Sequence, residues 1–172
     1  MYCESCGKEL KSQLGRYHYQ ESGLDYIWLE GIEIYECGNK GCEIYQQELG
    51  AIPKVEMLHS LIVKALIRYI FPFTGKESRF LRTYFGLKSK EWAEYLKVSA
   101  ETVSRWEKLV ESIGQQSDHL MRLLALRLLE EKEQSWISEV KSQQIVAANK
   151  RPAHHPLLIS HIEGIFHLVQ TQ

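Results

Sequence analysis

Four cysteines near the start of the chain are the residues best suited to binding a soft metal ion. Cys3 and Cys6 are separated by two residues, and Cys37 and Cys42 by four. A glycine follows the first pair and two glycines lie within the second, so backbone N–H groups can turn towards the thiolates. Four thiolates suit a tetrahedral Zn²⁺ ion with no open coordination position. We therefore expect one structural zinc ion per chain, bound by all four cysteines.

The same four cysteines permit two other interpretations. They could be free thiols, or they could hold iron in a rubredoxin-like electron carrier, which uses the same ligands. His18 could replace a cysteine ligand, although its place within an expected strand favours an exposed strand residue. Zinc is favoured because a segment of about 50 residues with few Leu or Val has only a marginal core, which a structural metal ion would stabilise.

A second pattern, LKSKEWAEYLKVSAETVSRWE in residues 87–107, predicts two short helices joined by a tight turn. Ala93 precedes Val103 by ten residues, and Trp106 lies one helical turn further on. This spacing packs two helices at a steep angle around a small apolar contact. Ser99 is expected to cap the second helix by accepting from the N–H of Thr102. The second helix would then project into a DNA major groove.

The second helix carries residue types that read base edges. We expect its first turn, Ala100 to Thr102, to meet the bases, with Glu101 able to accept from cytosine N4 although it repels phosphate. Arg105 lies one turn later and suits bidentate contact with guanine O6 and N7. The residues expected to contact phosphates are Ser89, Lys90, Lys97, Ser104 and Lys108.

Two positions depart from the usual form of this motif. Lys97 stands where a glycine normally adopts a positive φ, which costs another residue about 1 kcal/mol. Lys88 stands where Ser or Thr usually caps the first helix, so we expect Ser89 to cap it one residue late. The alternative interpretation is an ordinary helix pair packed on a core, with Val103 and Trp106 buried in either case.

The rest of the chain predicts an α+β protein. Three short strands are expected at 17–19, 25–37 and 43–49, and a helical period runs from Lys54 until Pro72 ends it. Further helices are expected at 77–85, begun near Thr74 or Gly75, and at 118–133, with Asp118 as N-cap or first-turn acid. QIVAAN (144–149) and PLLIS (156–160) predict either a strand pair or a tail.

Charge is unevenly distributed along the 172 residues, although the net charge is only −1. Residues 1–50 hold 4 Lys/Arg against 9 Asp/Glu, whereas residues 54–108 hold 11 against 6. An acidic start beside a basic middle indicates different partners for the two parts. There is no run of 18 apolar residues and no basic-then-apolar leader, so we expect a cytoplasmic protein without a membrane span.

Three stretches together resemble the MqsA-type family of antitoxins and regulators, which join a YgiT-type zinc finger to an Xre-type helix–turn–helix. They are CESCG, YHYQESGLDYIWLEGIEIYEC and GKESRFLRTYFGLKSKEWAEYLKVSAETVSRWE, and the resemblance covers residues 1 to 130 approximately. It implies a small β-rich zinc-binding domain followed by an all-α, Xre/Cro-like domain. The implied segments are a zinc domain at 1–52, a connecting helix at 53–75, a DNA-binding domain at 76–135 and a C-terminal extension at 136–172.

The resemblance also implies a function. Members repress their own operon by binding a palindrome as dimers, and in antitoxin members the zinc domain covers an mRNA-cleaving toxin. In the family, a polar residue and an Arg four positions later read the bases. These two positions match Glu101 and Arg105 here, although the polar residue is usually Asn. This chain departs from the family in its four-residue cysteine spacing, its longer connecting helix and its extension of about forty residues.

We therefore expect a homodimeric, zinc-stabilised repressor of a palindromic DNA operator, with a toxin-neutralising interaction protein as the alternative. We see no catalytic Ser/His/Asp set, phosphate-binding loop or carboxylate pair, and expect no enzyme. Candidate dimer contacts are the apolar face of helix 54–70 and the Leu-rich helix 118–130. The late histidines favour a solvated tail over a second metal site; they are His154, His155, His161 and His167.

Overall fold

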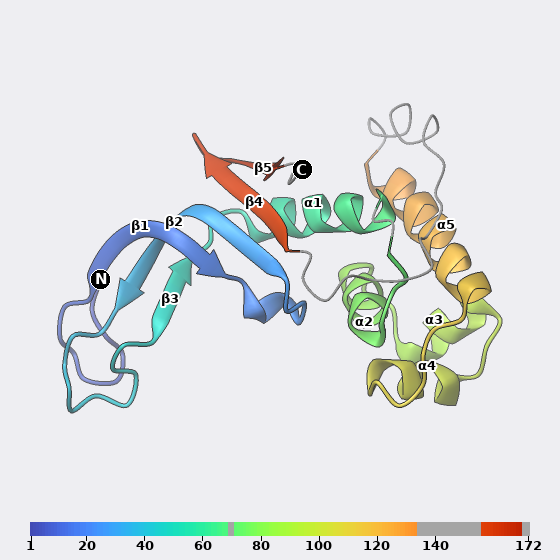
Figure 1. Ribbon diagram of the computed structural model, residues 1–172, viewed down its shortest axis with the longest axis horizontal. Coiled ribbons are helices and arrows are strands. Elements are labelled where there is room, and N and C mark those ends of the chain that lie inside the picture. Colours follow the sequence, from blue (N-terminus) through green and yellow to red (C-terminus); the bar gives the residue numbers. More distant parts are fainter. Residues whose placement is uncertain (69–70, 134–155, 170–172) are drawn as a thin grey trace. The chain divides into compact units, whose positions relative to one another are not determined.

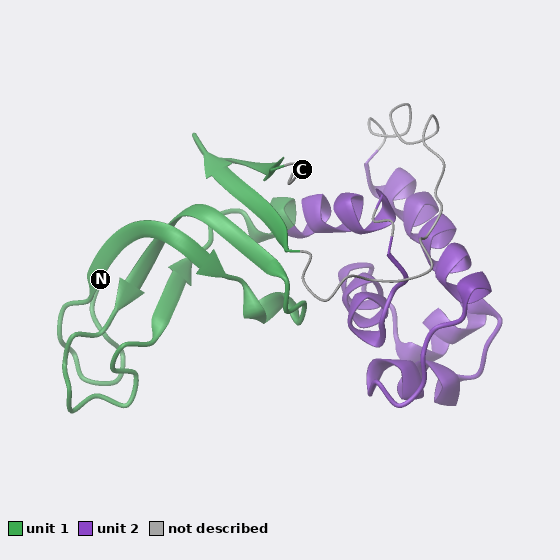
Figure 2. Cartoon of the chain, in the orientation of Figure 1, with its two compact units in different colours: residues 1–58, 154–172 green, residues 59–153 purple. Residues whose placement is uncertain are grey.

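A computed structural model of the chain describes residues 1–68, 71–133 and 156–169. Within these residues it is an α+β protein, as the sequence predicted, with a five-stranded sheet and five α-helices. The chain divides into two compact units, residues 1–58 with 154–172 and residues 59–153 (Figure 2). The helical unit is therefore an insertion between two parts of the sheet unit, whereas the sequence suggested separate segments in series.

The sheet is built around one long central strand, β2 (Figure 1). The strands are β1 (Lys11–His18), β2 (Ile27–Glu36), β3 (Glu48–Ala51), β4 (Leu157–Ile162) and β5 (Ile165–Val169). β1 pairs antiparallel with β2 along its length. The other edge of β2 is shared, because β3 pairs antiparallel with Glu33–Glu36 while β4 pairs parallel with Ile27–Glu30. β5 completes the sheet antiparallel to β4.

Alternating apolar residues turn one face of the sheet into a core. Ile27, Leu29, Ile32 and Ile34 of β2 are each at most 2% exposed. The alternation shifts by one residue at Gly31, where the pairing with β1 is also irregular. Gly31 has φ +73°, and a Cβ atom there would lie 2.6 Å from the carbonyl oxygen of His161, so only glycine suits this close approach.

Three strand predictions need correction. The strand expected at 17–19 is only the end of β1, which begins at Lys11 with exposed residues that show no apolar alternation. The strand expected at 43–49 is instead β3 at Glu48–Ala51, because the residues before it form turns that close the second cysteine loop. PLLIS lies largely in β4, but its hairpin partner is β5. QIVAAN, His154 and His155 lie outside the described residues, whereas His161 and His167 belong to strands.

The helices are α1 (Val55–Arg68), α2 (Gly75–Tyr84), α3 (Ser89–Leu96), α4 (Ala100–Glu107) and α5 (Gln115–Lys132). Thr74 caps α2 in a capping box with Glu77, as its place in the sequence suggested. Trp92 of α3 is fully buried and donates its indole N–H to Ser78 of α2 at 3.0 Å. Among residues 1–68, 71–133 and 156–169, no helix is long and apolar enough to cross a membrane.

A buried ion pair in α5 organises the helical unit. Asp118 lies in the first turn of α5, where its carboxylate accepts from Arg122 at 2.8 Å and from the Phe73 N–H at 2.8 Å. Arg122 is 0% exposed and donates to the carbonyl oxygens of Leu66 (3.0 Å) and Phe71 (2.7 Å). Because Leu66 lies in the last turn of α1, Arg122 supplies a donor to one of the final carbonyls of this helix.

Candidate metal centre and candidate nucleic-acid interface

The pairing of β1 with β2 brings the two cysteine pairs to the same end of the sheet. Lys11, the first residue of β1, lies opposite Glu36, the last residue of β2. The chain therefore enters β1 from the Cys3–Cys6 loop beside the point where β2 runs into Cys37. The register of the strands explains why cysteines more than thirty residues apart meet.

Backbone hydrogen bonds shape the two cysteine loops. In the first, the N–H of Gly7 donates to the carbonyl of Cys3 at 2.8 Å, and the N–H of Cys3 donates to Lys8 at 2.8 Å. In the second, the N–H of Cys42 donates to the carbonyl of Asn39 at 2.9 Å. The ammonium of Lys8 donates to the Asn39 side chain at 3.2 Å, which joins one loop to the other.

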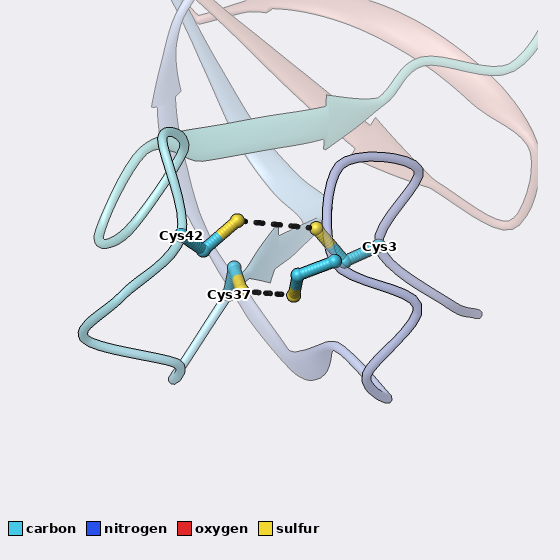
Figure 3. A group of neighbouring side chains, drawn as sticks. Cys3, Cys37 and Cys42 are labelled. Atoms are coloured by element: carbon cyan, nitrogen blue, oxygen red, sulfur yellow. Dashed lines mark hydrogen bonds between the residues drawn. The ribbon is translucent and has the colours of Figure 1, made fainter.

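The four sulfur atoms form one compact cluster (Figure 3). Cys3 and Cys42 have their Sγ atoms 3.6 Å apart, as do Cys6 and Cys37, and all four Sγ atoms lie within 4.8 Å of one another. All four cysteines are free. Sulfur atoms about 2.3 Å from a tetrahedral ion lie about 3.8 Å apart, so the observed spacing fits a metal ion. The predicted ligand set is therefore brought together and could hold a metal.

The electrostatics of the cluster also fit a cation. The backbone of Lys8 and the side chain of Asn39 lower the pKa of Cys6 to about 6. Although the backbone of Asn39 lowers the pKa of Cys37, burial and the neighbouring cysteines outweigh it and raise that pKa to about 12. One thiolate therefore forms readily, whereas further thiolates beside it need a compensating positive charge. A bound metal ion supplies that charge.

Helices α3 and α4 form the predicted pair. Ala93, Leu96, Val103 and Trp106 are all at most 3% exposed, so both helices turn apolar residues inward. Lys97, between the helices, has φ 56° and ψ 37°, which confirms the left-handed conformation predicted for it. The turn is closed by a hydrogen bond from the N–H of Val98 to the carbonyl of Ala93, at 3.0 Å.

The caps of the two helices confirm one prediction and correct another. The Ser99 hydroxyl accepts from the N–H of Thr102 at 3.0 Å, as predicted for the cap of α4. Ser89 does not cap α3, because it is the first helical residue. The cap position belongs to Lys88, whose backbone N–H donates to the carboxylate of Glu91 at 2.6 Å. The carboxylate of the third helical residue thus satisfies the N–H of the cap residue itself, whereas a capping serine hydroxyl accepts from an N–H of the first turn.

Two contacts that the sequence analysis did not identify hold α4 against α2. The guanidinium of Arg82 donates to both carboxylate oxygens of Glu107, at 2.7 and 2.9 Å, and to the carbonyl of Leu87 at 3.0 Å. The carboxylate of Glu107 raises the pKa of Arg82. At the start of α2, a Cβ atom on Gly75 would lie only 1.7 Å from the carbonyl oxygen of Trp106. Both contacts fix α4 at its C-terminal end.

The outer face of α4 is polar. At 100° per residue, five of its predicted contact residues fall within an arc of about 140°; they are Ala100, Glu101, Ser104, Arg105 and Lys108. Ser104 is partly buried and the other four are exposed. Thr102 lies about 60° beyond this arc and is partly buried, as is Ser89, whereas Lys90 and Lys97 are exposed.

Arg105 and Glu101 form an ion pair on this face. Their side chains are 55% and 73% exposed, and Arg105 Nη2 lies 2.7 Å from Glu101 Oε1. The guanidinium is therefore accessible to a partner and is also in contact with a carboxylate of its own helix. The sequence predicts both residues as contacts with bases, but it does not indicate that they pair with each other.

Comparisons with known proteins add no relative to this description. The chain matches no family model, no curated protein and no solved structure.

Proposed function

We propose that this chain is a sequence-specific DNA-binding regulator, acting as a homodimer on a palindromic operator and stabilised by a structural zinc ion. In this proposal α3 and α4 are a helix–turn–helix, and α4 is the recognition helix. The observation that carries the proposal is the two-sided nature of α4. Val103 and Trp106 bury one side of it, while the opposite side presents Glu101, Arg105 and Lys108 to solvent.

The surroundings of α4 suit a polyanion. Four lysines around the helix pair are exposed, namely Lys88, Lys90, Lys97 and Lys108. The first turn of α4, Ala100 to Thr102, carries no bulky apolar side chain, which suits entry into a major groove. The excess of basic over acidic residues in 54–108 adds a sequence-independent attraction to phosphates.

Zinc is the metal that we propose for the cysteine cluster. Four thiolates with no further ligand suit zinc or iron. The core around Leu10 is small, and a redox-inert zinc ion would stabilise it as well as an iron ion would. We expect a colourless protein containing one zinc ion per chain by elemental analysis. A red protein with visible absorption would instead indicate a rubredoxin-like iron centre.

The DNA-binding proposal is tested by replacing Arg105. Arg105→Ala should cost about 1–3 kcal/mol at one base pair and relax the preference there, as measured by gel shift on the promoter of its own gene. Arg127→Ala is the matched control, because Arg127 is also an exposed arginine in an i,i+4 ion pair but lies on α5. Binding that keeps its full sequence preference after Arg105→Ala contradicts the assignment.

A second candidate function is suggested by the acidic balance of residues 1–50, which hold 9 Asp/Glu against 4 Lys/Arg. Such a surface is suited to covering a basic nuclease, as in a toxin-neutralising protein. Co-expression with the product of the neighbouring gene tests it, and a stable complex with a small basic protein supports it. The two functions are compatible in one chain.

A further inference from the structure

The ion pair on the outer face of α4 combines hydrogen-bond donors and acceptors in one unit. Glu101 Oε1 accepts from Arg105 Nη2 at 2.7 Å, across one turn of helix. Both side chains are more than half exposed on the same arc of α4, and the pair leaves further guanidinium N–H donors and a second carboxylate oxygen outside this contact. The helix therefore presents several donors beside an acceptor.

This arrangement matches one kind of base pair. In the major groove a G·C pair offers two acceptors, guanine N7 and O6, followed by one donor, the cytosine N4 amino group. An A·T pair offers an acceptor, a donor and another acceptor. A guanidinium beside a carboxylate complements the G·C pattern. Opposite an A·T pair, the carboxylate would face an acceptor instead of a donor.

We propose that Glu101 and Arg105 act as a single recognition unit for a G·C base pair. Arg105 binds guanine O6 and N7, while the Glu101 carboxylate holds the guanidinium in place and accepts from the N4 amino group of a cytosine in the same or the adjacent pair. The inference rests on the proposed function, since it assumes that α4 enters the major groove. It goes further by coupling the two contacts through the ion pair, so that guanine and cytosine are read together at this face.

An ordinary solvated ion pair is the competing explanation. Exposed i,i+4 pairs are common and contribute only about 0.3–0.5 kcal/mol to a helix. The chain contains such a pair in Arg127 and Glu131 of α5, 3.4 Å apart and 77% and 61% exposed. It has the same spacing as the α4 pair and lies outside the proposed recognition helix, so it provides a matched control.

The test is selection of binding sites from a pool of random duplexes by the full-length, zinc-loaded protein. The wild-type protein should enrich a G·C pair in each half-site. Glu101→Gln should change the selected base at the cytosine position to adenine, because glutamine pairs with adenine N6 and N7. Discrimination for cytosine over adenine should fall by about 5- to 150-fold. Glu131→Gln should select the wild-type sequence.

A second variant separates recognition from simple repulsion. Glu101→Ala removes a negative charge near the phosphates, so overall affinity should rise while the preference at the cytosine position is lost. If both Glu101 variants bind more tightly but select the wild-type sequence, the carboxylate reads no base and the inference is overturned. If the wild-type protein enriches no sequence, the proposed function itself has failed. Thermal unfolding of each variant, followed by circular dichroism, establishes that this exposed site leaves the fold intact.

Discussion

The cysteine cluster and the Asp118–Arg122 pair are two buried polar centres among the described residues, and they are stabilised in different ways. Arg122 and Asp118 neutralise each other and share their remaining hydrogen bonds with backbone groups, so the helical unit contains everything that its centre needs. In the cysteine cluster, burial and the neighbouring cysteines raise the pKa of Cys37, so ionisation of its thiol beside the others is disfavoured. A bound cation would favour the thiolates, so this centre is suited to a component from outside the chain.

The largest effect is expected from removing the metal. Structural zinc contributes an apparent 10–16 kcal/mol in small zinc-binding peptides at about neutral pH, and the core beside the cysteines is small. A chelator should therefore release the Cys3 and Cys37 loops, and hydrogen exchange should accelerate in residues 1–10 and 37–47. The helical unit should keep its protection. Equal loss of protection in both units would show that the sheet unit depends on the metal no more than the helical unit does.

Breaking the helical centre should have the next largest effect. Arg122→Ala leaves a buried carboxylate and unsatisfied backbone carbonyls, so the free energy of unfolding should fall by about 3–5 kcal/mol in urea denaturation. Arg127→Ala on the same helix should change it by less than about 0.5 kcal/mol, because that side chain is 77% exposed. The double change Asp118→Leu with Arg122→Met should recover part of the loss. Equal effects of the two Arg→Ala changes would contradict a structural role for Arg122.

The smallest effect is expected at the turn before α4. Lys97 holds a left-handed backbone conformation, φ 56°, that glycine adopts without strain. Lys97→Gly should therefore stabilise the helical unit by about 0.5 kcal/mol, while Glu94→Gly within α3 should destabilise it by about 1 kcal/mol. Loss of the Lys97 charge should also reduce the salt dependence of DNA binding by about one unit of slope. Equal destabilisation by both glycines would show that the turn is unstrained.

Local patterns explain what the sequence could predict. The N-cap at Ser99 and the left-handed Lys97 each depend on residues within one or two turns of chain, and the structure confirms both. Each cysteine pair is also a local pattern, but the two pairs meet through strand pairing, in a cluster that could hold a metal. The α+β class followed from the change of apolar period near Pro53. Which residues contact DNA remains a prediction.

Long-range pairing explains what the sequence could not predict. Arg122 is a charged residue within a Leu-rich helix, and its partners among the Leu66 and Phe71 carbonyls carry no signal in their side-chain types. Arg82 and Glu107 are 25 residues apart and look like two solvated charges. The placement of β4 beside β2 was missed for the same reason, because parallel pairing across 130 residues leaves no local pattern.

The pairing of β4 with β2 has a consequence for biosynthesis. The edge of β2 at Ile27–Glu30 is completed only by residues 157–160, which are translated after the entire helical unit. At roughly 5–20 residues per second, the ribosome needs about 6–25 s to travel from the end of β2 to β4. During that time the nascent sheet has an unpaired edge. The inserted helices can also fold in this interval, before the sheet unit on either side of them in the sequence is complete.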